Sequence, residues 1–284
     1  MLVVALIAGA AVAHATWNLA IKRAGATGPS FLWLMAVVGA VAYAPFGIHS
    51  LLTEGVDLLR WLPWAAVSGG LQVAYFLVLQ RGYRLGDVSV VYPLARGSGP
   101  LLSVVLAMLI LHERPTWLQL VGVVVVVAGV MIIGFAGDRH SRRSNRAGVV
   151  YGLVVGVVIA IFTMWDASAV LVADLPPIGL YWGSVLFQAL LLSVPALRRP
   201  HATLAVGRAH PFNIVLVGVL APLAYILVLT AMQLAPVSVI APAREVSVVL
   251  VGLGGWLLFG EPHPIRRLIG AGIVLGGVAL LAVG

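Results

Sequence analysis

Four charged side chains interrupt the long apolar runs of this sequence: Arg96, Asp166, Arg244 and Glu245. A charge at the centre of a membrane span costs roughly 2.5–3.5 kcal/mol on insertion scales, so each of these residues needs a partner or a function. Two of the four are positive and two are negative, which favours paired burial over a strongly charged pore. Arg244 and Glu245 are adjacent and would point about 100° apart on a helix, so one or both need a partner elsewhere. Asp166 is a candidate partner for Arg244 or Arg96.

Aromatic and amide side chains recur near these charges at helical spacing. His14, Trp17 and Asn18 occupy positions i, i+3 and i+4 of one helix face, and Tyr92 and Arg96 are also four residues apart. Such side chains could line a cavity for a small zwitterion or organic ion, because rings make cation–π contacts and arginine binds a carboxylate or phosphonate. The candidate substrate-binding residues are Trp17, Asn18, Gln72, Tyr75, Tyr92, Arg96, Trp165, Tyr225 and Arg244.

Three of the polar residues are candidates for proton binding. Burial in a low-dielectric environment favours the neutral form of a carboxylate, which makes Asp166 and Glu245 the first candidates. His14 is the second, because imidazole changes charge near neutral pH. A hydrogen-bonded structural role is the competing interpretation for His14, and Trp17 and Trp165 could simply pack between helices.

Prolines accompany the two arginines. Pro93 and Pro100 lie in the run that contains Arg96, and Pro242 lies two residues before Arg244. Proline removes a backbone donor and frees a carbonyl nearby, which predicts locally polar backbone beside the charges. Arg96 could instead extend its side chain to the nearer membrane interface.

The apolar runs that hold these residues are long enough to cross a bilayer, which takes about 20 residues per helix. Of the 284 residues, 62% are hydrophobic and only 9% are charged, too few charges to cover a soluble domain of this length. We predict an all-α integral membrane protein with ten transmembrane helices. The predicted spans are 2–21, 29–48, 61–80, 88–111, 115–135, 148–172, 177–197, 211–233, 237–259 and 265–283.

The basic residues that give the net charge of +8 are distributed unevenly among the predicted connections. Thirteen of the 17 Lys and Arg residues fall in or directly beside the connections after spans one, three, five, seven and nine, counting Arg266 and Arg267 at the start of span ten, against two in the other four connections. Cytoplasmic loops are enriched in Lys and Arg. We therefore predict a plasma-membrane protein with these five connections in the cytoplasm and both termini outside, and we expect no nucleic-acid partner.

The sequence repeats itself at a nearly constant offset. The motif Ala-Tyr-x-Leu-Val-Leu begins at residue 74 and again at residue 224. Glu113 and Glu261, which follow two spans and are expected to be structural anchors, lie 148 residues apart. Two five-helix halves are predicted, residues 1–136 and 148–284. Because five is odd, the second half must enter the membrane from the opposite side, an architecture of many secondary transporters with a site near the midplane.

No motif of a catalytic or cofactor site is present in the sequence. It has no cysteine, which excludes disulfides, thiolate metal sites and thiol catalysis. It also lacks a nucleotide-binding P-loop, a paired His spacing for a metal and a Gly-x-Ser-x-Gly nucleophile elbow. We expect neither an enzyme nor a bound cofactor or metal. The expected partners are the lipid bilayer and a small-molecule substrate, with a monomer as the default state.

Ten helices, two repeats, and Glu113 or Glu261 followed by a Gly-bearing helix resemble the EamA branch of the drug/metabolite transporter superfamily. The resemblance extends over essentially the full chain. It implies two inverted five-helix repeats and secondary transport without ATP hydrolysis, by alternating access through a central cavity. Two stretches, His-Ala-Thr-Trp-Asn from His14 with Lys22, and Tyr-Pro-Leu-Ala-Arg-Gly from Tyr92, are similar to an EamA subgroup associated with phosphonate utilisation. Other EamA members are similar to amino-acid and metabolite exporters.

We therefore predict a secondary transporter that exports a small polar or zwitterionic metabolite such as an amino acid. Coupling to protons and facilitated diffusion both fit the sequence. The alternatives are uptake of phosphonate-type compounds, a membrane enzyme acting on a lipid-linked substrate, and a non-transporting scaffold or sensor subunit. A channel has no support, because the sequence contains neither a ring of like charges nor a carbonyl filter.

Overall fold

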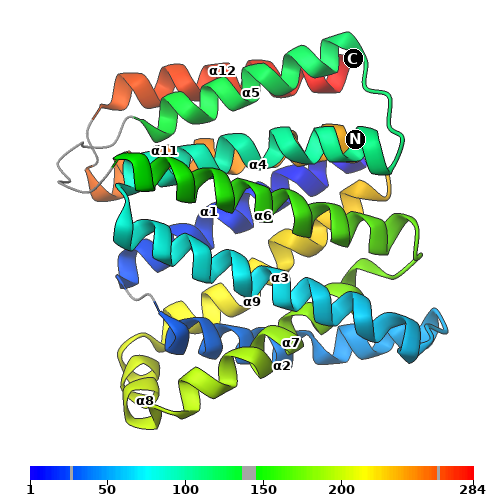
Figure 1. The fold of residues 1–284 in the computed structure, drawn as a ribbon, viewed down its shortest axis with the longest axis vertical. Helices are drawn as coiled ribbons and strands as arrows, with labels where there is room; N and C mark the ends of the chain where they lie inside the picture. The colour runs from blue at the N-terminus through cyan, green and yellow to red at the C-terminus, as the bar shows by residue number, and fades with distance from the viewer. Residues whose placement is uncertain (26–27, 136–144, 261–262) are drawn as a thin grey trace.

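The computed structural model describes residues 1–25, 28–135, 145–260 and 263–284, and this part of the chain is helical without strands (Figure 1). The helices are α1 (Leu2–Ala24), α2 (Pro29–Thr53), α3 (Leu58–Leu85), α4 (Val88–Ile110), α5 (Trp117–Gly134), α6 (Asn145–Leu171), α7 (Pro177–Leu197), α8 (Pro200–Ala209), α9 (Pro211–Met232), α10 (Val237–Ala243), α11 (Val246–Phe259) and α12 (Pro264–Val283).

The ten predicted spans are confirmed. With α10 and α11 counted as one, ten helices in the described residues are long and apolar enough to cross a membrane. Their bounds differ from the predicted ones by at most five residues. The connection predicted between residues 198 and 210 instead contains the short helix α8. Thr203 on α8 lies 2.9 Å from Ser30 Oγ on α2 and donates to the Ala196 carbonyl at the end of α7, which fastens α8 to the bundle.

The ninth span is broken in the middle. Arg244 and Glu245 lie in a turn between α10 and α11, where the Glu245 N–H donates to the Pro242 carbonyl at 3.1 Å, three residues back instead of four. Pro242 explains the break, because its ring lacks an N–H and excludes the carbonyl four residues earlier. Pro93 and Pro100 have no such effect, since α4 continues through both.

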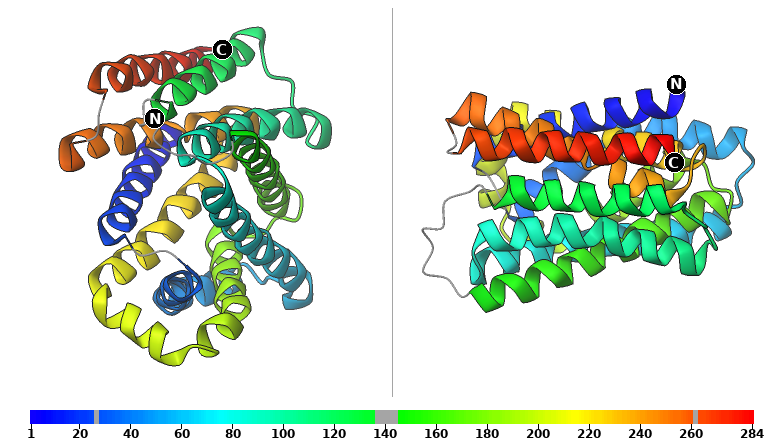
Figure 2. Two further views of the ribbon diagram at one scale, coloured as in Figure 1. Left: turned by 60° about the vertical axis from the view of Figure 1, so that its left-hand side comes forward. Right: turned by 90° about the horizontal axis from the view of Figure 1, so that it is seen from above.

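Helix pairing follows the internal repeat. In Figure 1, α1 runs from the side of the termini to the opposite side, and α6 runs the other way. α1 packs against α9 and α11, and α6 packs in the equivalent way against α3 and α4. Two pairs, α2 with α7 and α5 with α12, join equivalent helices of the two halves; α5 and α12 lie side by side along one edge of the bundle (Figure 2). The fold is thus two inverted five-helix repeats.

Glycines allow the backbones of α5 and α12 to approach each other closely. A Cβ atom on Gly277 would lie 2.7 Å from the Val126 nitrogen, and one on Gly129 would lie 2.8 Å from the Gly270 carbonyl oxygen. Small residues at such contacts are the usual means of packing helices in lipid, where no hydrophobic effect drives helices together. This edge pair lies away from the centre of the bundle, where the remaining helices surround a cavity.

Candidate functional site

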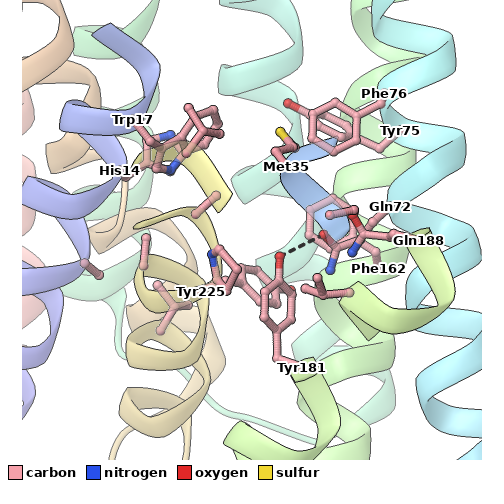
Figure 3. A pocket seen from close by; sticks show the side chains of 18 of the residues that line it. His14, Trp17, Met35, Gln72, Tyr75, Phe76, Phe162, Tyr181, Gln188 and Tyr225 are labelled. Carbon is pink, nitrogen blue, oxygen red and sulfur yellow. Dashed lines mark hydrogen bonds between the residues drawn. The ribbon is translucent and has the colours of Figure 1, made fainter. Parts of the chain in front are cut away.

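A cavity of about 130 Å³ lies where the two halves meet (Figure 3). Its walls come from α1, α2, α3, α4, α6, α7, α9 and the broken ninth span. A row of rings covers one wall: the Phe162 centroid lies 5.8 Å from that of Tyr75 and 6.0 Å from that of Tyr225. Small residues such as Ala36 and Gly218 also line the cavity. Cavities of this kind, mostly apolar with a few polar groups, are typical of small-molecule sites.

Two arginines contribute positive charge to the cavity. Arg96 on α4 and Arg244 in the broken span both line it. Glu245 is 1% exposed, and its Oε1 lies 3.5 Å from Arg96 Nη1 and 3.5 Å from Arg244 Nε. This one carboxylate therefore compensates two guanidinium groups, and the cluster keeps a net charge of +1. Its polar atoms facing the cavity are hydrogen-bond donors, since a guanidinium has no acceptor.

His14 extends this cluster. Its Nε2 lies 2.6 Å from Arg96 Nη2, and because the guanidinium can only donate, Nε2 must be the acceptor and the ring is neutral with its proton on Nδ1. The ring packs edge-on against Trp17, with centroids 4.8 Å apart. The buried indole N–H of Trp17 has no hydrogen-bond partner in the described part of the chain. Protonation of His14 would place two cations in contact, which disfavours it as a proton carrier.

A second cluster of polar side chains lies at the cavity wall: Gln72, Tyr181 and Tyr225 line the cavity, and Asp166 on α6 lies behind Tyr225. The Tyr225 hydroxyl donates to Asp166 Oδ2 at 3.0 Å, and the Tyr181 hydroxyl donates to Gln72 Oε1 at 3.1 Å. The two rings are neighbours, with centroids 4.7 Å apart. Figure 3 shows the Tyr181 hydroxyl bonded to Gln72 in the cavity wall.

Uncharged polar side chains hold this group in place. Ser184 Oγ on α7 lies within hydrogen-bond distance of Ser68 Oγ (3.0 Å), Gln72 Nε2 (3.5 Å) and Gln188 Nε2 (3.4 Å). All four residues are buried. Because a buried polar group without a partner costs about 1–3 kcal/mol, such a network favours a single arrangement of the amides.

Seven of the twelve residues predicted for the site line the cavity: His14, Trp17, Gln72, Tyr75, Arg96, Tyr225 and Arg244. Asp166 and Glu245 lie directly behind this lining, each bonded or paired to a residue of it.

The other three predicted residues lie outside the cavity wall. Asn18 donates to the His14 carbonyl one turn earlier, at 2.8 Å. The Tyr92 ring lies 5.8 Å from the Arg96 guanidinium carbon, where it supports that side chain. The Trp165 indole N–H donates to the Trp64 carbonyl at 3.0 Å, and the two rings pack at 4.4 Å. Trp165 therefore packs between α3 and α6, in agreement with the structural alternative for this residue.

The expectations about the buried charges had different outcomes. Glu245 has the expected partner elsewhere, Arg96 on α4, but it also pairs with Arg244, because the turn between α10 and α11 replaces the helical geometry that would separate the two side chains. Asp166 pairs with neither arginine among the described residues; its hydrogen-bond partner is Tyr225.

Sequence reasoning missed several large or polar lining residues, among them Met35, Phe76, Phe162, Tyr181 and Gln188. A signal existed for two of them. Tyr181 and Gln188 lie seven residues apart with Val185 between them, at i, i+4 and i+7 of one face of the seventh span. Gln188 lies in an apolar span and is as conspicuous there as Gln72, which is among the predicted site residues.

Glu113 joins the two halves outside the cavity. Its Oε1 accepts from the Val237 N–H at 2.7 Å and its Oε2 from the Ser238 N–H at 2.9 Å. The carboxylate thus caps the amino-terminal end of α10, where orphan backbone donors and the helix dipole favour an anion. This agrees with the expected anchoring role, and its counterpart Glu261 lies outside the described residues. Within those residues, no group of three or more His, Asp or Glu is placed to hold a metal ion.

Comparison with known proteins gives three results. Residues 1–135 and 146–283 match the family described as "EamA-like transporter family". The "Probable terminal-alkyne amino-acid exporter" of Streptantibioticus cattleyicolor is 28% identical over 164 residues, 52% of this chain and 53% of that protein, so the similarity spans about half of the relative. A protein of known crystal structure has the same fold, with a TM-score of 0.72 and 17% identity over 99% of this chain and 96% of that chain.

Proposed function

The chain belongs to the EamA-like transporter family, and on that premise we propose that it exports a small zwitterionic metabolite, such as an amino acid, through the central cavity. It is a multi-pass membrane transporter of two repeated halves. The observation that carries the proposal is the pair Arg96 and Arg244 in the wall of an otherwise largely apolar cavity. The carboxylate of the substrate binds these guanidinium groups, and its side chain contacts the aromatic wall.

The charge of the arginine cluster supports an anionic group as its ligand. Glu245 offsets one of the two positive charges and lies behind Arg96 and Arg244, so one positive charge remains for a ligand. Charge-assisted hydrogen bonds from arginine to a carboxylate are about twice as strong as neutral ones. The name of the relative as an amino-acid exporter, with similarity over half of its length, agrees with this choice of substrate.

Inverted repeats supply the conformational change in this proposal. The two halves move relative to each other and expose the cavity alternately to the two sides of the membrane. We place the basic connections in the cytoplasm and both termini outside. Because the chain has no cysteine, single cysteines can test this orientation. Glu54→Cys reacts with an impermeant maleimide on whole cells and Arg84→Cys does not; the reverse result refutes the orientation.

Asp166 is our candidate for coupling transport to protons. It is 1% exposed, and Oδ1 has no partner in the described part of the chain. The titratable groups that face it are the phenols of Tyr225 on α9 and Tyr181 on α7. Glu245 is the weaker candidate, because it already has two guanidinium partners.

Transport in proteoliposomes tests the function. Wild-type protein should move radiolabelled amino acids down their gradient without ATP, and Arg96→Gln and Arg244→Gln should abolish this flux. Arg81→Gln, which removes an exposed arginine outside the cavity, is the matched control and should keep the flux. A panel that includes phosphonates separates the uptake alternative, since phosphonates would then outcompete amino acids. Turnover of lipid without solute flux would establish a membrane enzyme instead, and flux that ignores a pH gradient would refute proton coupling.

A further inference from the structure

The hydroxyl hydrogens of Tyr181 and Tyr225 are both already donated to protein side chains. Tyr225 donates its hydrogen to Asp166 Oδ2 at 3.0 Å, and Tyr181 donates its hydrogen to Gln72 Oε1 at 3.1 Å. A phenol has one hydrogen and two lone pairs. Both oxygens can therefore offer only acceptor lone pairs to a molecule in the cavity.

The two acceptors are close together and lie on facing elements. Tyr181 comes from α7 and Tyr225 from α9, their ring centroids are 4.7 Å apart, and both residues line the cavity. Figure 3 shows the two rings next to each other, with His14 and Trp17 in a separate part of the same wall. The two phenol oxygens thus offer acceptors to a ligand, whereas Arg96 and Arg244 line the same cavity with donors only.

A buried carboxyl group lies behind the acceptor pair. Asp166 is 1% exposed, has no cationic partner within the described residues, and its Oδ1 has no hydrogen-bond partner there. The ionised form of such a group is costly in a membrane span unless a cation compensates it. Glu245, by contrast, already has two guanidinium partners. The carboxyl group that lacks a cation is thus the one that accepts a hydrogen bond from Tyr225.

We infer that Tyr181 and Tyr225, with Asp166 behind them, form the binding site for the ammonium group of the substrate. The ammonium donates to the two phenol oxygens, and the Asp166 charge reaches it through the Tyr225 hydroxyl. This inference rests on the proposed function, because it takes the carboxylate of the same molecule to lie at Arg96 and Arg244. It assigns Tyr181 and Tyr225 to recognition of the amine and gives Asp166 a positioning and electrostatic role.

The test compares two probes that differ only in the amine. The first is L-propargylglycine, an amino acid with a terminal alkyne, and the second is the corresponding carboxylate without the amino group. Each probe competes with radiolabelled L-propargylglycine for binding to purified protein, and the readout is the ratio of the two apparent affinities. A role in folding alone would not change this ratio.

Tyr181→Phe, Tyr225→Phe and Asp166→Asn should each lower the preference for the amino acid roughly tenfold or more, as expected for the loss of a hydrogen bond or charge that acts on a cation. Affinity for the probe without the amine should stay within about twofold. Tyr43→Phe is the matched control, because its hydroxyl donates to the Val219 carbonyl outside the cavity. It should leave the ratio unchanged.

The outcomes separate this inference from the proposed function. If the wild-type protein prefers the amino acid and all three variants keep that preference, or weaken both probes equally, the ammonium site is wrong and the function stands. If the wild-type protein binds neither probe nor any other amino acid, the proposed function itself fails. Should Asp166→Asn not fold, the two Tyr→Phe variants decide, since each removes a single hydroxyl and keeps the ring.

Discussion

Glu245→Gln is the sharpest perturbation of the central cluster. The wild-type cluster holds Arg96, Arg244 and Glu245 with a net charge of +1, and the substitution raises it to +2 at nearly constant volume. Glu245 is 1% exposed, and the arginine side chains are 13% and 12% exposed, so little water is available to screen the added charge.

The magnitude follows from the two distances. At an effective dielectric constant of about 20, a pair at the observed 3.5 Å attracts by roughly 5 kcal/mol. The carboxylate itself lost several kcal/mol of solvation on burial, and this cost offsets part of the two attractions. Removing one partner of a buried pair typically destabilises by about 3–5 kcal/mol, and we expect a loss in that range for Glu245→Gln.

Thermal unfolding of the purified protein in detergent measures this effect. Glu245→Gln should lower the melting temperature by about 5 °C or more. The double variant Arg244→Gln/Glu245→Gln restores the net charge to +1 and should melt closer to the wild type than Glu245→Gln does, with a coupling free energy of about 1 kcal/mol or more. The reasoning is refuted if Glu245→Gln melts within about 1 °C of the wild type, or if the effects of the two substitutions simply add.

Three further predictions concern Glu113, the glycines of α12 and the guanidinium group of Arg96. Glu113→Gln should destabilise the protein by about 1–3 kcal/mol in the same melting assay, because it removes the charge from two bonds to the end of α10; the exposed Glu54→Gln is the control and should be neutral. Gly277→Ala should be destabilising and its neighbour Gly276→Ala neutral or slightly stabilising, since only the first Cβ meets the backbone of α5. Arg96→Lys should weaken binding of amino acids roughly tenfold in a competition assay, because lysine keeps the charge but not the planar donor group that also reaches His14.

The fold could be predicted from the sequence because the bilayer restricts the possible structures. A span needs about 20 apolar residues with all backbone groups bonded internally, so hydropathy alone located the ten helices. The repeat then fixed the relation of the two halves, since a five-helix unit must invert. Helix α8 was missed because it is short and lies in a connection, where neither length nor hydropathy distinguishes a helix from a loop.

The site was predicted less completely, and the reason is local geometry. Arg96, Arg244, Gln72 and Tyr225 are conspicuous in apolar spans, and all four line the cavity. Which partner each charge takes depends on side-chain direction, and a continuous helix was the wrong assumption at Arg244. Tyr181 was overlooked because a tyrosine near the start of a span is ordinary, and the face that it shares with Gln188 was not recognised; its contacts with Gln72 and Tyr225 are visible only in the structure.

The distribution of the four buried charges argues for a substrate that carries both signs. The cluster around Glu245 keeps one positive charge, and Asp166, which has no cationic partner among the described residues, contributes a negative charge in its ionised form. A purely anionic solute would leave the charge of Asp166 uncompensated. A purely cationic solute would leave the remaining positive charge of Arg96 and Arg244 uncompensated. A zwitterion compensates both charges at once. Because Glu245 already pairs with both guanidinium groups, the carboxylate of the substrate is held less tightly than it would be by two unpaired arginines. That balance favours release, which a transporter requires as much as binding.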